Sequence, residues 1–523
     1  MSDPRTDPPA EHPWLIAATV MLGTFMAVMD VSVVNVALPH MMGTFSVDLS
    51  EVTWVATGYA IAQILVMTMS GWLSAIVGRK RLYVGSMVVF IVGSVLAGTA
   101  RSFGAMLLYR AIQGAGGGAM IPVALSILRE TFGKAQQGMA MAVYGMGVVL
   151  APAIGPVLGG WLTDTYGWPW IFYINVPVSV PALLLALALL RDPPYLRRGV
   201  ARIDWAGLAL LAVGLTSLQL VLERGQEEDW FASRWIVAGT VVAVAALAAL
   251  AVWELRARHP VVNVRLFGNG PLALSSVIGL VFGVALFGTT FILPQFTQTL
   301  LGYPAFQSGL AVAPRAASLF VTMPVAGWLL KHLDGRVLIL GGIALICWGY
   351  WDLAHLSLDV GFWNLVPALL VLGAGMPFMF VTLTTMSLST VDRADVTDAS
   401  GLYTLARTLG GNIGYALTAT LVADYTQVHR VTLVQRVSAY NPNFLALQAR
   451  ATQFLVAGGQ DPAGAQQTAN ALVNAQVNAQ AAMMAYNDAS LWLGALFVVL
   501  VPLVFFLPGR PAREAGPGST VAA

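Results

Sequence analysis

The feature that most constrains this 523-residue chain is a series of long apolar stretches along its whole length. A helix needs about 20 apolar residues to cross the hydrocarbon core of a bilayer. Only 10% of the residues are charged, whereas a soluble chain of this size carries roughly a quarter. We therefore predict an all-α polytopic membrane protein. The predicted spans are residues 14–39, 54–77, 82–100, 104–128, 138–163, 169–190, 204–223, 235–253, 271–300, 307–330, 337–354, 362–388, 399–424 and 490–508.

The placement of Lys and Arg predicts the orientation in the membrane. The basic stretches GRKR (78–81), RDPPYLRRGVAR (191–202) and ELRARHPVVNVR (254–265) all fall on the side of the N-terminus. Loops rich in Lys and Arg stay cytoplasmic. Since the number of spans is even, both termini are predicted to be cytoplasmic, as a 1–13 tail and a disordered 509–523 tail. The scattered basic residues do not predict nucleic-acid binding.

Two sequence matches indicate an internal duplication. GWLSAIVGRKRLYVG (71–85) recurs as GWLLKHLDGRVLILG (327–341), and GAGGGAM (114–120) is echoed by GAGMPFM (373–379). Parallel halves related by an axis along the membrane normal are typical of one large transporter architecture. The predicted parts are an N-terminal six-helix half at 14–190, an inserted helix pair at 204–253, and a C-terminal six-helix half at 271–508 with an extracytoplasmic loop at 425–489.

Several stretches resemble one family. GWLSAIVGRKRL, which begins at residue 71, is similar to the loop between spans 2 and 3 of the major facilitator superfamily. MDVSVVNVALP (29–39), WIFYINVP (170–177) and ASGLYTLARTLGGNIG (399–414) resemble its fourteen-span drug:proton antiporters, the multidrug exporters of the EmrB/QacA type. The resemblance covers residues 14–508 and implies a major facilitator fold with 14 transmembrane helices.

The loop that follows the second span carries the first motif of conformational gating. In the family the glycines permit a tight turn and the basic residues anchor the loop at the cytoplasmic face. These residues are Gly71, Gly78, Arg79, Lys80 and Arg81. The family often has an aspartate where this chain has Ala75, which puts a charge relay through that position in doubt. Alternatively, the basic triplet only determines topology.

A second gating motif lies in the fifth span. GMGVVLAPAIGPVLGGW (145–161) resembles the signature that the family associates with antiport rather than uptake. Its key residues are Gly145, Pro152, Gly155, Pro156, Gly159 and Gly160. Proline removes a backbone donor and glycine allows close helix contact, so we expect a pliable helix that seals the two halves against each other. A generic Gly/Pro-rich span is the alternative.

The energy source for transport is predicted by exclusion. The sequence contains no GxxxxGK[ST] motif, and the six histidines are isolated from other metal-ligating residues. No arrangement of a nucleophile with a base stands out, so we predict neither an enzyme nor a bound cofactor. An ion gradient then needs a titratable group within the membrane.

Asp30 and Arg110 are the candidates for proton coupling. Asp30 is the only acid well inside the predicted spans of the N-terminal half. At about 1.5 Å of rise per residue, both side chains lie in the outer half of the bilayer. Burial disfavours a charged carboxyl and a nearby arginine favours it, so a change in their separation would move a proton on or off Asp30. A fixed ion pair that holds two helices together is the alternative.

The substrate site is predicted between the two halves. Met and aromatic side chains there would accept varied apolar ligands, because Met adapts its shape. The candidates are Met26, Met29, Gln113, Phe291, Met376 and Arg407. The charged residues Arg315, Asp352 and Arg407 are also interpreted as structural.

The predicted function is a proton-coupled antiporter that exports hydrophobic or amphipathic drugs across the inner membrane. Uptake or export of one specific metabolite by the same fold is the alternative. The loop at 425–489 contains two predicted helices split by GGQDPAG (458–464). A similar loop occurs in EmrB-type pumps, which work with a periplasmic membrane-fusion adaptor and an outer-membrane channel, so the resemblance implies these partners. A plain cover over the outer mouth is equally compatible with the loop.

Overall fold

The structure is a computed structural model that describes residues 12–133, 136–192, 204–258, 260–435, 437 and 440–509. Every regular element in these ranges is a helix. The predicted tails at 1–13 and 509–523 lie almost entirely outside the described residues. Helices of the first part are α1 (Pro13–Phe45), α2 (Leu49–Val52), α3 (Trp54–Thr68), α4 (Ser70–Val77), α5 (Arg79–Gly98), α6 (Phe103–Thr131), α7 (Gln137–Tyr166), α8 (Trp170–Tyr173) and α9 (Asn175–Leu189).

The remaining helices form the middle and the end of the chain. The middle ones are α10 (Trp205–Arg224), η1 (Trp230–Ala232), α11 (Arg234–Arg256) and η2 (Val264–Gly268). Those that follow are α12 (Gly270–Gln295), η3 (Phe296–Leu300), α13 (Ala305–Leu329), α14 (Gly335–Leu353), α15 (Phe362–Ser387), η4 (Arg393–Asp395), α16 (Val396–Val434), α17 (Pro442–Ala457) and α18 (Pro462–Val504).

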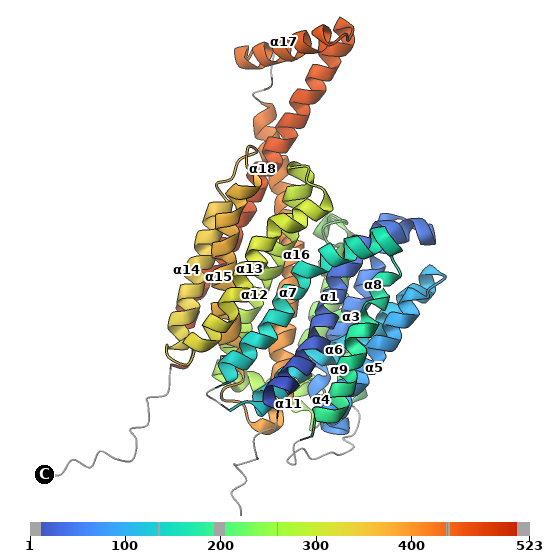
Figure 1. The fold of residues 1–523 in the computed structure, drawn as a ribbon, viewed down its shortest axis with the longest axis vertical. Helices are drawn as coiled ribbons and strands as arrows, with labels where there is room; N and C mark the ends of the chain where they lie inside the picture. The colour runs from blue at the N-terminus through green and yellow to red at the C-terminus, as the bar shows by residue number, and fades with distance from the viewer. Residues whose placement is uncertain are drawn as a thin grey trace, which may run out of the picture.

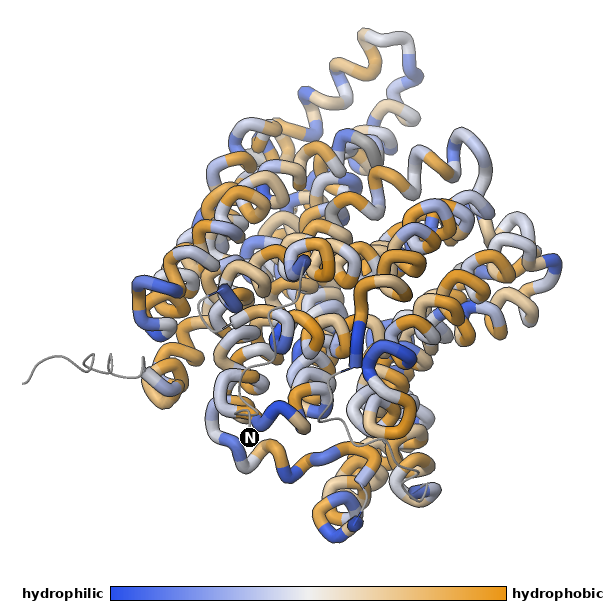
Figure 2. The backbone as a smooth tube through the Cα atoms, turned by 60° about the horizontal axis from the view of Figure 1, so that its bottom comes forward, coloured by the Kyte–Doolittle hydropathy of each residue, from blue (hydrophilic) through white to orange (hydrophobic). Residues whose placement is uncertain are grey.

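The helices are long and apolar enough for a multi-pass membrane protein. In the described part of the chain, 11 helices could each cross a bilayer, or up to 13 spans if each of two bent pairs is one. α16 covers the predicted span 399–424 but is not among them. Apolar residues predominate along the bundle helices, and hydrophilic ones gather at their ends (Figure 2). A polytopic all-α protein is therefore confirmed, and the number 14 stays a prediction.

The same helix pairings occur in the first and in the last part of the bundle. α1 packs against α7, α3 against α6, and α5 against α6. The corresponding pairs in the last part are α12 with α16, α13 with α15, and α14 with α15. Contacts between the two parts run from α7 to α13 and from α6 to α16, at the centre of the bundle (Figure 1).

The middle pair, α10 and α11, packs on the side of the bundle. α10 contacts α3 and α16, which belong to different parts of the chain. Asn412 of α16 donates to Gln219 of α10 at 2.6 Å. Arg224 of α10 donates to the Ser50 carbonyl at 2.6 Å and to the Thr53 hydroxyl at 2.9 Å. The pair is thus held to both parts by hydrogen bonds.

The predicted loop at 425–489 is mostly helical, as its two predicted helices imply, and its helices continue from the neighbouring predicted spans. α16 continues to Val434, and α18 begins at Pro462 and runs through the region predicted as span 490–508 to Val504. The break between the two predicted helices is present between α17 and α18, where Gly459 has a φ of +94°. These helices project from the bundle as an extension of residues 425–489 (Figure 1). Alanine-rich and glutamine-rich segments extend the spans because they favour helix outside the membrane too.

Candidate functional site

The first functional candidate is an ion pair buried among α1, α6 and α9. Arg110 Nη1 lies 2.5 Å from Asp30 Oδ2, and both side chains are inaccessible to solvent. The structure thus brings together the two residues that the sequence singles out. A buried charge is stable only when it is paired and hydrogen-bonded, so each of the two depends on the other.

Two amides complete the shell of the Asp30 carboxylate. Gln113 Nε2 donates to Asp30 Oδ1 at 2.8 Å, and Asn175 Nδ2 donates to the same oxygen at 2.9 Å. Both amides also donate to the Ser94 hydroxyl, at 2.7 and 2.8 Å. The carboxylate therefore accepts from α6 twice and from α9 once, which is the bonding pattern of an ionised group. We call Asp30, Ser94, Arg110, Gln113 and Asn175 the Asp30 cluster.

The Arg110 guanidinium has further contacts of its own. Nε donates to the Val55 carbonyl at 3.1 Å, and the Tyr59 ring centroid lies 4.3 Å from Cζ. Nη2 is buried without a hydrogen-bond partner in the described part of the chain. Because one donor of Arg110 is unsatisfied, a rearrangement of its surroundings can improve its bonding.

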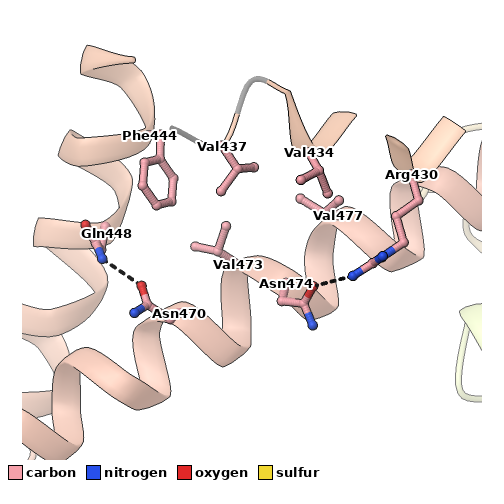
Figure 3. Close-up of a pocket in the computed structure, with 9 residues that line it drawn as sticks. All are labelled: Arg430, Val434, Val437, Phe444, Gln448, Asn470, Val473, Asn474 and Val477. Carbon is pink, nitrogen blue, oxygen red and sulfur yellow. Dashed lines mark hydrogen bonds between the residues drawn. The ribbon is translucent and has the colours of Figure 1, made fainter. Parts of the chain in front are cut away.

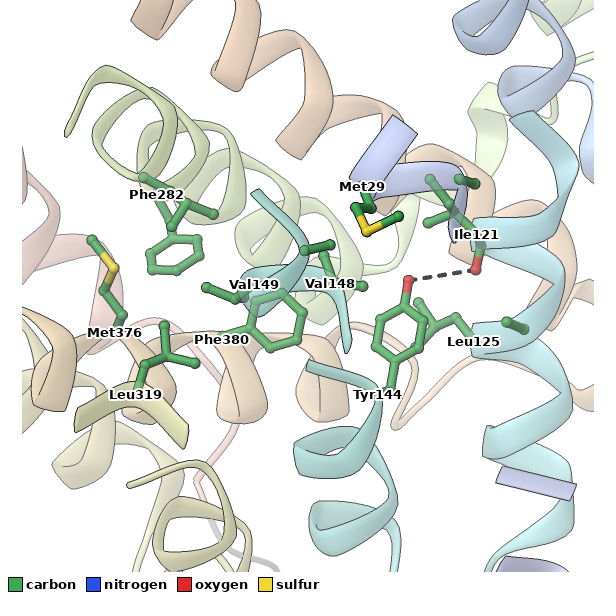
Figure 4. Packing of buried hydrophobic residues seen from close by; sticks show 14 of the residues in the cluster. Met29, Ile121, Leu125, Tyr144, Val148, Val149, Phe282, Leu319, Met376 and Phe380 are labelled. Atoms are coloured by element: carbon green, nitrogen blue, oxygen red, sulfur yellow. Dashed lines mark hydrogen bonds between the residues drawn. The ribbon is translucent and has the colours of Figure 1, made fainter. Parts of the chain in front are cut away.

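The interface between the two parts of the bundle is filled by apolar side chains (Figure 4). Met29 of α1 and Val148 of α7 lie on one side, and Phe380 and Met376 of α15 lie on the other. The Tyr144 and Phe380 rings are stacked across the interface with centroids 6.3 Å apart. Met29 is the neighbour of Asp30 in the chain, so α1 presents adjacent residues to the ion pair and to this interface.

The substrate-cavity candidates lie in different places. Met26, Met29 and Met376 are buried, whereas Gln113 belongs to the Asp30 cluster. Phe291 is half-buried against the Tyr415 ring, with centroids 5.9 Å apart. Their role in substrate binding stays a prediction.

Arg407 of α16 is buried at the same interface. Its Cζ lies 5.0 Å from the Phe380 ring centroid, and that ring stacks on Tyr144 of α7. Only 5% of the residue is exposed.

At one end of the bundle, Arg79 joins the two parts of the chain. Its guanidinium forms an ion pair with Glu130 of α6. Nε donates to the Thr397 hydroxyl at 2.7 Å, and Nη2 donates to the Arg393 carbonyl at 3.0 Å. We call Arg79, Glu130, Arg393, Thr397 and Asp398 the Arg79 cluster. Glu130 supplies an acid to Arg79 although Ala75 replaces the usual aspartate of the motif.

The two glycines of the same motif are required for different reasons. Gly78 has a φ of +92° and a ψ of 156°, a backbone region open almost only to glycine. A Cβ on Gly71 would lie within 1.6 Å of Asp398 Oδ1, so Gly71 lets α16 approach α4. Lys80 donates to the Leu187 carbonyl at 2.6 Å, and Arg81 is exposed. The turn thus needs Gly78 for its backbone and Gly71 for space.

The glycines of α7 correct one interpretation. A Cβ on Gly155 would meet the Ser32 side chain at 2.7 Å, and one on Gly159 would meet the Val33 carbonyl at 2.9 Å. Both neighbours belong to α1 of the same half, so the expected close contact of this motif with the facing half is wrong at these positions. Gly145 does face the other half, because a Cβ there would meet Phe380 at 2.7 Å. The glycines of this one motif therefore face both halves, Gly155 and Gly159 their own and Gly145 the other.

The prolines of α7 lie where the helix bends. Pro152 and Pro156 are both inside the helix, and the segments 137–152 and 154–166 differ in direction by 44°. Proline in a helix interior removes one hydrogen bond and displaces the preceding turn. The bend is the expected consequence.

A cavity of about 370 Å³ lies in the extension, away from both clusters (Figure 3). Arg430, Asn470 and Val473 are among its lining residues. Arg430 donates to Asn478 at 2.7 Å, and Gln448 donates to Asn470 at 2.6 Å. These bonds tie α16, α17 and α18 together outside the bundle.

Comparison with known proteins identifies the family. Residues 20–415 match the Major Facilitator Superfamily. The chain is 34% identical over 515 residues to the multidrug export protein EmrB of Escherichia coli (strain K12), with 98% of each chain covered. It is 32% identical over 496 residues to EmrB of Haemophilus influenzae, with 94% of this chain and 95% of that protein covered. This chain belongs to the major facilitator superfamily, in its EmrB group.

A solved structure supports the fold of this EmrB-group chain. The crystal structure of the human organic anion transporter MFSD10 (TETRAN) is 14% identical and superposes with a TM-score of 0.59. The match covers 94% of this chain and 100% of that chain. The predicted major facilitator fold and the resemblance to EmrB-type exporters are thus confirmed, and the family is one of transporters.

Sequence reasoning missed part of the Asp30 cluster. Ser94 and Asn175 lie 64 and 145 positions from Asp30, and nothing local to Asp30 points to them. Asn175 did carry a signal, because an amide in the apolar stretch WIFYINVP (170–177) should face a polar partner. Glu130 and Asp398 of the Arg79 cluster were missed because each lies at a helix end, where a charged residue is unremarkable.

Proposed function

We propose that this EmrB-group protein is a proton-coupled antiporter that exports hydrophobic or amphipathic compounds by alternating access. Its similarity to two multidrug export proteins along nearly the whole chain supports export of this kind. The observation that carries the proton coupling is the Asp30–Arg110 ion pair, fully buried in an apolar bundle. A buried ionisable pair in a membrane protein is expensive and marks a functional site.

The bonding of Asp30 suggests how one proton changes the conformation. Ionised Asp30 accepts hydrogen bonds from Arg110, Gln113 and Asn175. Protonation removes the charge that balances Arg110 and converts one acceptor oxygen into a donor. The arginine then lacks a counter-charge, so α1 must shift relative to α6 and α9 or water must enter.

A shift of α1 reaches the interface directly. α1 packs along α7, and α7 in turn contacts α13 and α15 of the other half. Met29, next to Asp30, already lies at that interface (Figure 4). Proton binding at Asp30 would therefore change how tightly the two halves close on a bound compound.

Export requires a defined orientation. We place the protein in the inner (plasma) membrane with both termini cytoplasmic, as the basic loops indicate. The Arg79 cluster then lies at the cytoplasmic end and the extension of residues 425–489 outside. We assign the exposed face of the extension to contact with a periplasmic membrane-fusion adaptor that leads to an outer-membrane channel.

The test compares Asp30→Asn and Asp30→Glu with wild type in a host that lacks its own pumps. Export of a fluorescent dye should be abolished by a proton uncoupler in wild type. Asp30→Asn should lose uncoupler-sensitive export, while Asp30→Glu should retain part of it. Asp352→Asn, an acid near the end of α14 and outside the cluster, serves as the control. Wild-type export by Asp30→Asn would refute the assignment.

A further inference from the structure

Arg407 is a buried cation without a carboxylate partner. Five arginines are buried in the described part of the chain: Arg79, Arg110, Arg224, Arg315 and Arg407. The first three are paired with Glu130, Asp30 and Glu227. Among the described residues no carboxylate lies within ion-pair distance of Arg407, whose guanidinium lies over the face of the Phe380 ring. This ring is neutral, so the charge is not balanced locally.

The surroundings of Arg407 differ from those of Arg315. Arg315 Nη2 donates to the Leu286 carbonyl at 3.3 Å and to the Thr290 hydroxyl at 3.4 Å, both on α12 of its own half. Arg407 instead lies over Phe380, whose ring stacks on Tyr144 of α7 in the other half. Opening the interface would therefore uncover the ring on which Arg407 lies, whereas the contacts of Arg315 stay within one half.

The chemistry around Arg407 combines one fixed positive charge with apolar surfaces. Phe282 and Phe380 lie with ring centroids 6.3 Å apart, and Met376 of α15 lies near them (Figure 4). A guanidinium presents planar donors that match a carboxylate or a sulfonate. Met and aromatic side chains accept alkyl chains and rings of varied shape. A ligand that satisfies both has an anionic head and an apolar body.

From this geometry we propose that Arg407 binds the anionic head group of amphipathic substrates, whose apolar part lies along Phe380, Phe282 and Met376. This inference rests on the proposed export function and names the substrate class. The bound anion supplies a counter-charge to Arg407 and accepts charge-assisted hydrogen bonds from its guanidinium when the halves part. A neutral substrate of the same shape leaves Arg407 unpaired and binds more weakly.

The experiment uses two probes that differ only in charge, 11-(dansylamino)undecanoate and its carboxamide. Their binding to the purified full-length protein in lipid nanodiscs is measured by dansyl fluorescence at neutral pH. Wild type should bind the acid at least about tenfold more tightly than the amide, since one charge-assisted pair is worth about that factor. This first comparison needs no variant, so it does not depend on the folding of a mutant.

The variants then assign the difference to one side chain. Arg407→Gln should weaken binding of the acid about tenfold and change binding of the amide less than about threefold, while Arg407→Lys retains part of the preference. Arg315→Gln, which removes an equally buried arginine, should affect the two probes alike. Equal affinity of wild type for acid and amide, or an equal loss of both in Arg407→Gln, would overturn the proposal.

A transport assay distinguishes failure of the Arg407 proposal from failure of the proposed export function. In inverted membrane vesicles, uncoupler-sensitive accumulation of the amide by wild type shows that the pump works. Arg407→Gln should lower accumulation of the acid more than that of the amide, whereas Arg315→Gln should lower neither selectively. If wild type accumulates the amide but neither binds nor accumulates the acid, only the inference about Arg407 fails. If an uncoupler changes accumulation of neither probe, proton-coupled export fails, and the binding comparison alone decides the role of Arg407.

Discussion

At the scale of single residues, Asn175 shows how a neutral side chain can control a charged one. Its Nδ2 donates both to Asp30 Oδ1 at 2.9 Å and to Ser94 Oγ at 2.8 Å. Asn175 lies in the first turn of α9, so this bond connects α9 to α1 through the carboxylate. Asn175 is therefore a positioning residue for Asp30, since its hydrogen bond sets the orientation of the acid.

We predict that Asn175→Ala reduces proton-coupled export without abolishing it. A hydrogen bond to a charged group is worth about 1.5–3 kcal/mol, and the Asp30 carboxylate would lose one. The rate of substrate-driven proton exchange in proteoliposomes measures the reduction. Asn35→Ala, an exposed residue of α1, is the control and should exchange protons like wild type. Wild-type exchange by Asn175→Ala would remove Asn175 from the coupling.

At the scale of elements, the packing of α7 on α1 depends on single atoms. A Cβ on Gly159 would lie 2.9 Å from the Val33 carbonyl oxygen, closer than side chains tolerate. A Cβ on Gly160, the next residue, would have Val36 Cγ1 at 3.8 Å as its nearest neighbour, an ordinary contact. Two adjacent glycines of one motif thus differ in what they permit, because successive residues of a helix face different directions.

We expect Gly159→Ala to destabilise the protein and reduce export, whereas Gly160→Ala should resemble wild type. Overpacking of a tight contact costs about 1–3 kcal/mol. Thermal unfolding in detergent and dye export in cells measure the two effects. Equal behaviour of both variants would mean that the α1–α7 contact does not limit the fold. Because the contact is internal to one half, the loss should appear in stability as well as in transport.

At the scale of the whole molecule, the Arg79 cluster joins the halves at the end opposite the extension. Asp398 stands in the first turn of α16, ahead of the predicted span, and lies against Gly71 of α4. Burial raises the pKa of Asp398 to about 7, to which the neighbouring Asp395 adds, while Arg79 lowers it. We call the form in which the Arg79 cluster joins the halves the closed form, and the form in which water reaches this cluster the open form. In the closed form Asp398 keeps its proton up to about pH 7, whereas a hydrated carboxyl releases its proton near the ordinary pKa of 3.8.

The sign of the pH effect follows from this difference. Between about pH 4 and pH 7 the closed form binds more protons than an open, hydrated form, so its relative stability falls as the pH rises through that window. The closed-to-open ratio should fall by up to about tenfold per pH unit and level off above pH 7. Spin labels at Arg81→Cys and Ala394→Cys, with Cys347→Ala, would report the distance across the cluster. Asp398→Asn should remove the pH dependence, and a dependence that persists in it would exclude Asp398.

The extension provides a second prediction at this scale. Two apolar residues of the extension are exposed: Val431 has 62% and Phe454 has 80% of its surface accessible to solvent. In the proposed orientation both side chains lie outside the membrane, and we propose them as anchors of the contact with an adaptor. Val431→Asp and Phe454→Asp should lower drug resistance of intact two-membrane cells at least about fourfold, as loss of an interface anchor does. Transport into inverted vesicles should be unchanged, because it needs no adaptor.

Gln466→Glu, an exposed polar position of α18, is the matched control and should leave resistance intact. Loss of transport in vesicles as well would show that the extension supports the bundle itself. Unchanged resistance of the cells would contradict contact with an adaptor at this surface.

The sequence by itself determined the helical class, the approximate ends of most membrane helices, the family, and the pair Asp30 and Arg110. The helical class, the helix ends and the charged pair follow from local properties: apolar length specifies a membrane helix, and a charge within one must find a partner. The family follows from the resemblance of the motifs. The tertiary structure alone decided which partners those are. Asn175 and Glu130 meet the charged residues across long sequence separations, Ser94 meets the amides beside them, and Gly155 and Gly159 face α1 rather than the other half. Helix packing decides such contacts, because the direction in which a side chain points depends on how its helix is rotated against its neighbours.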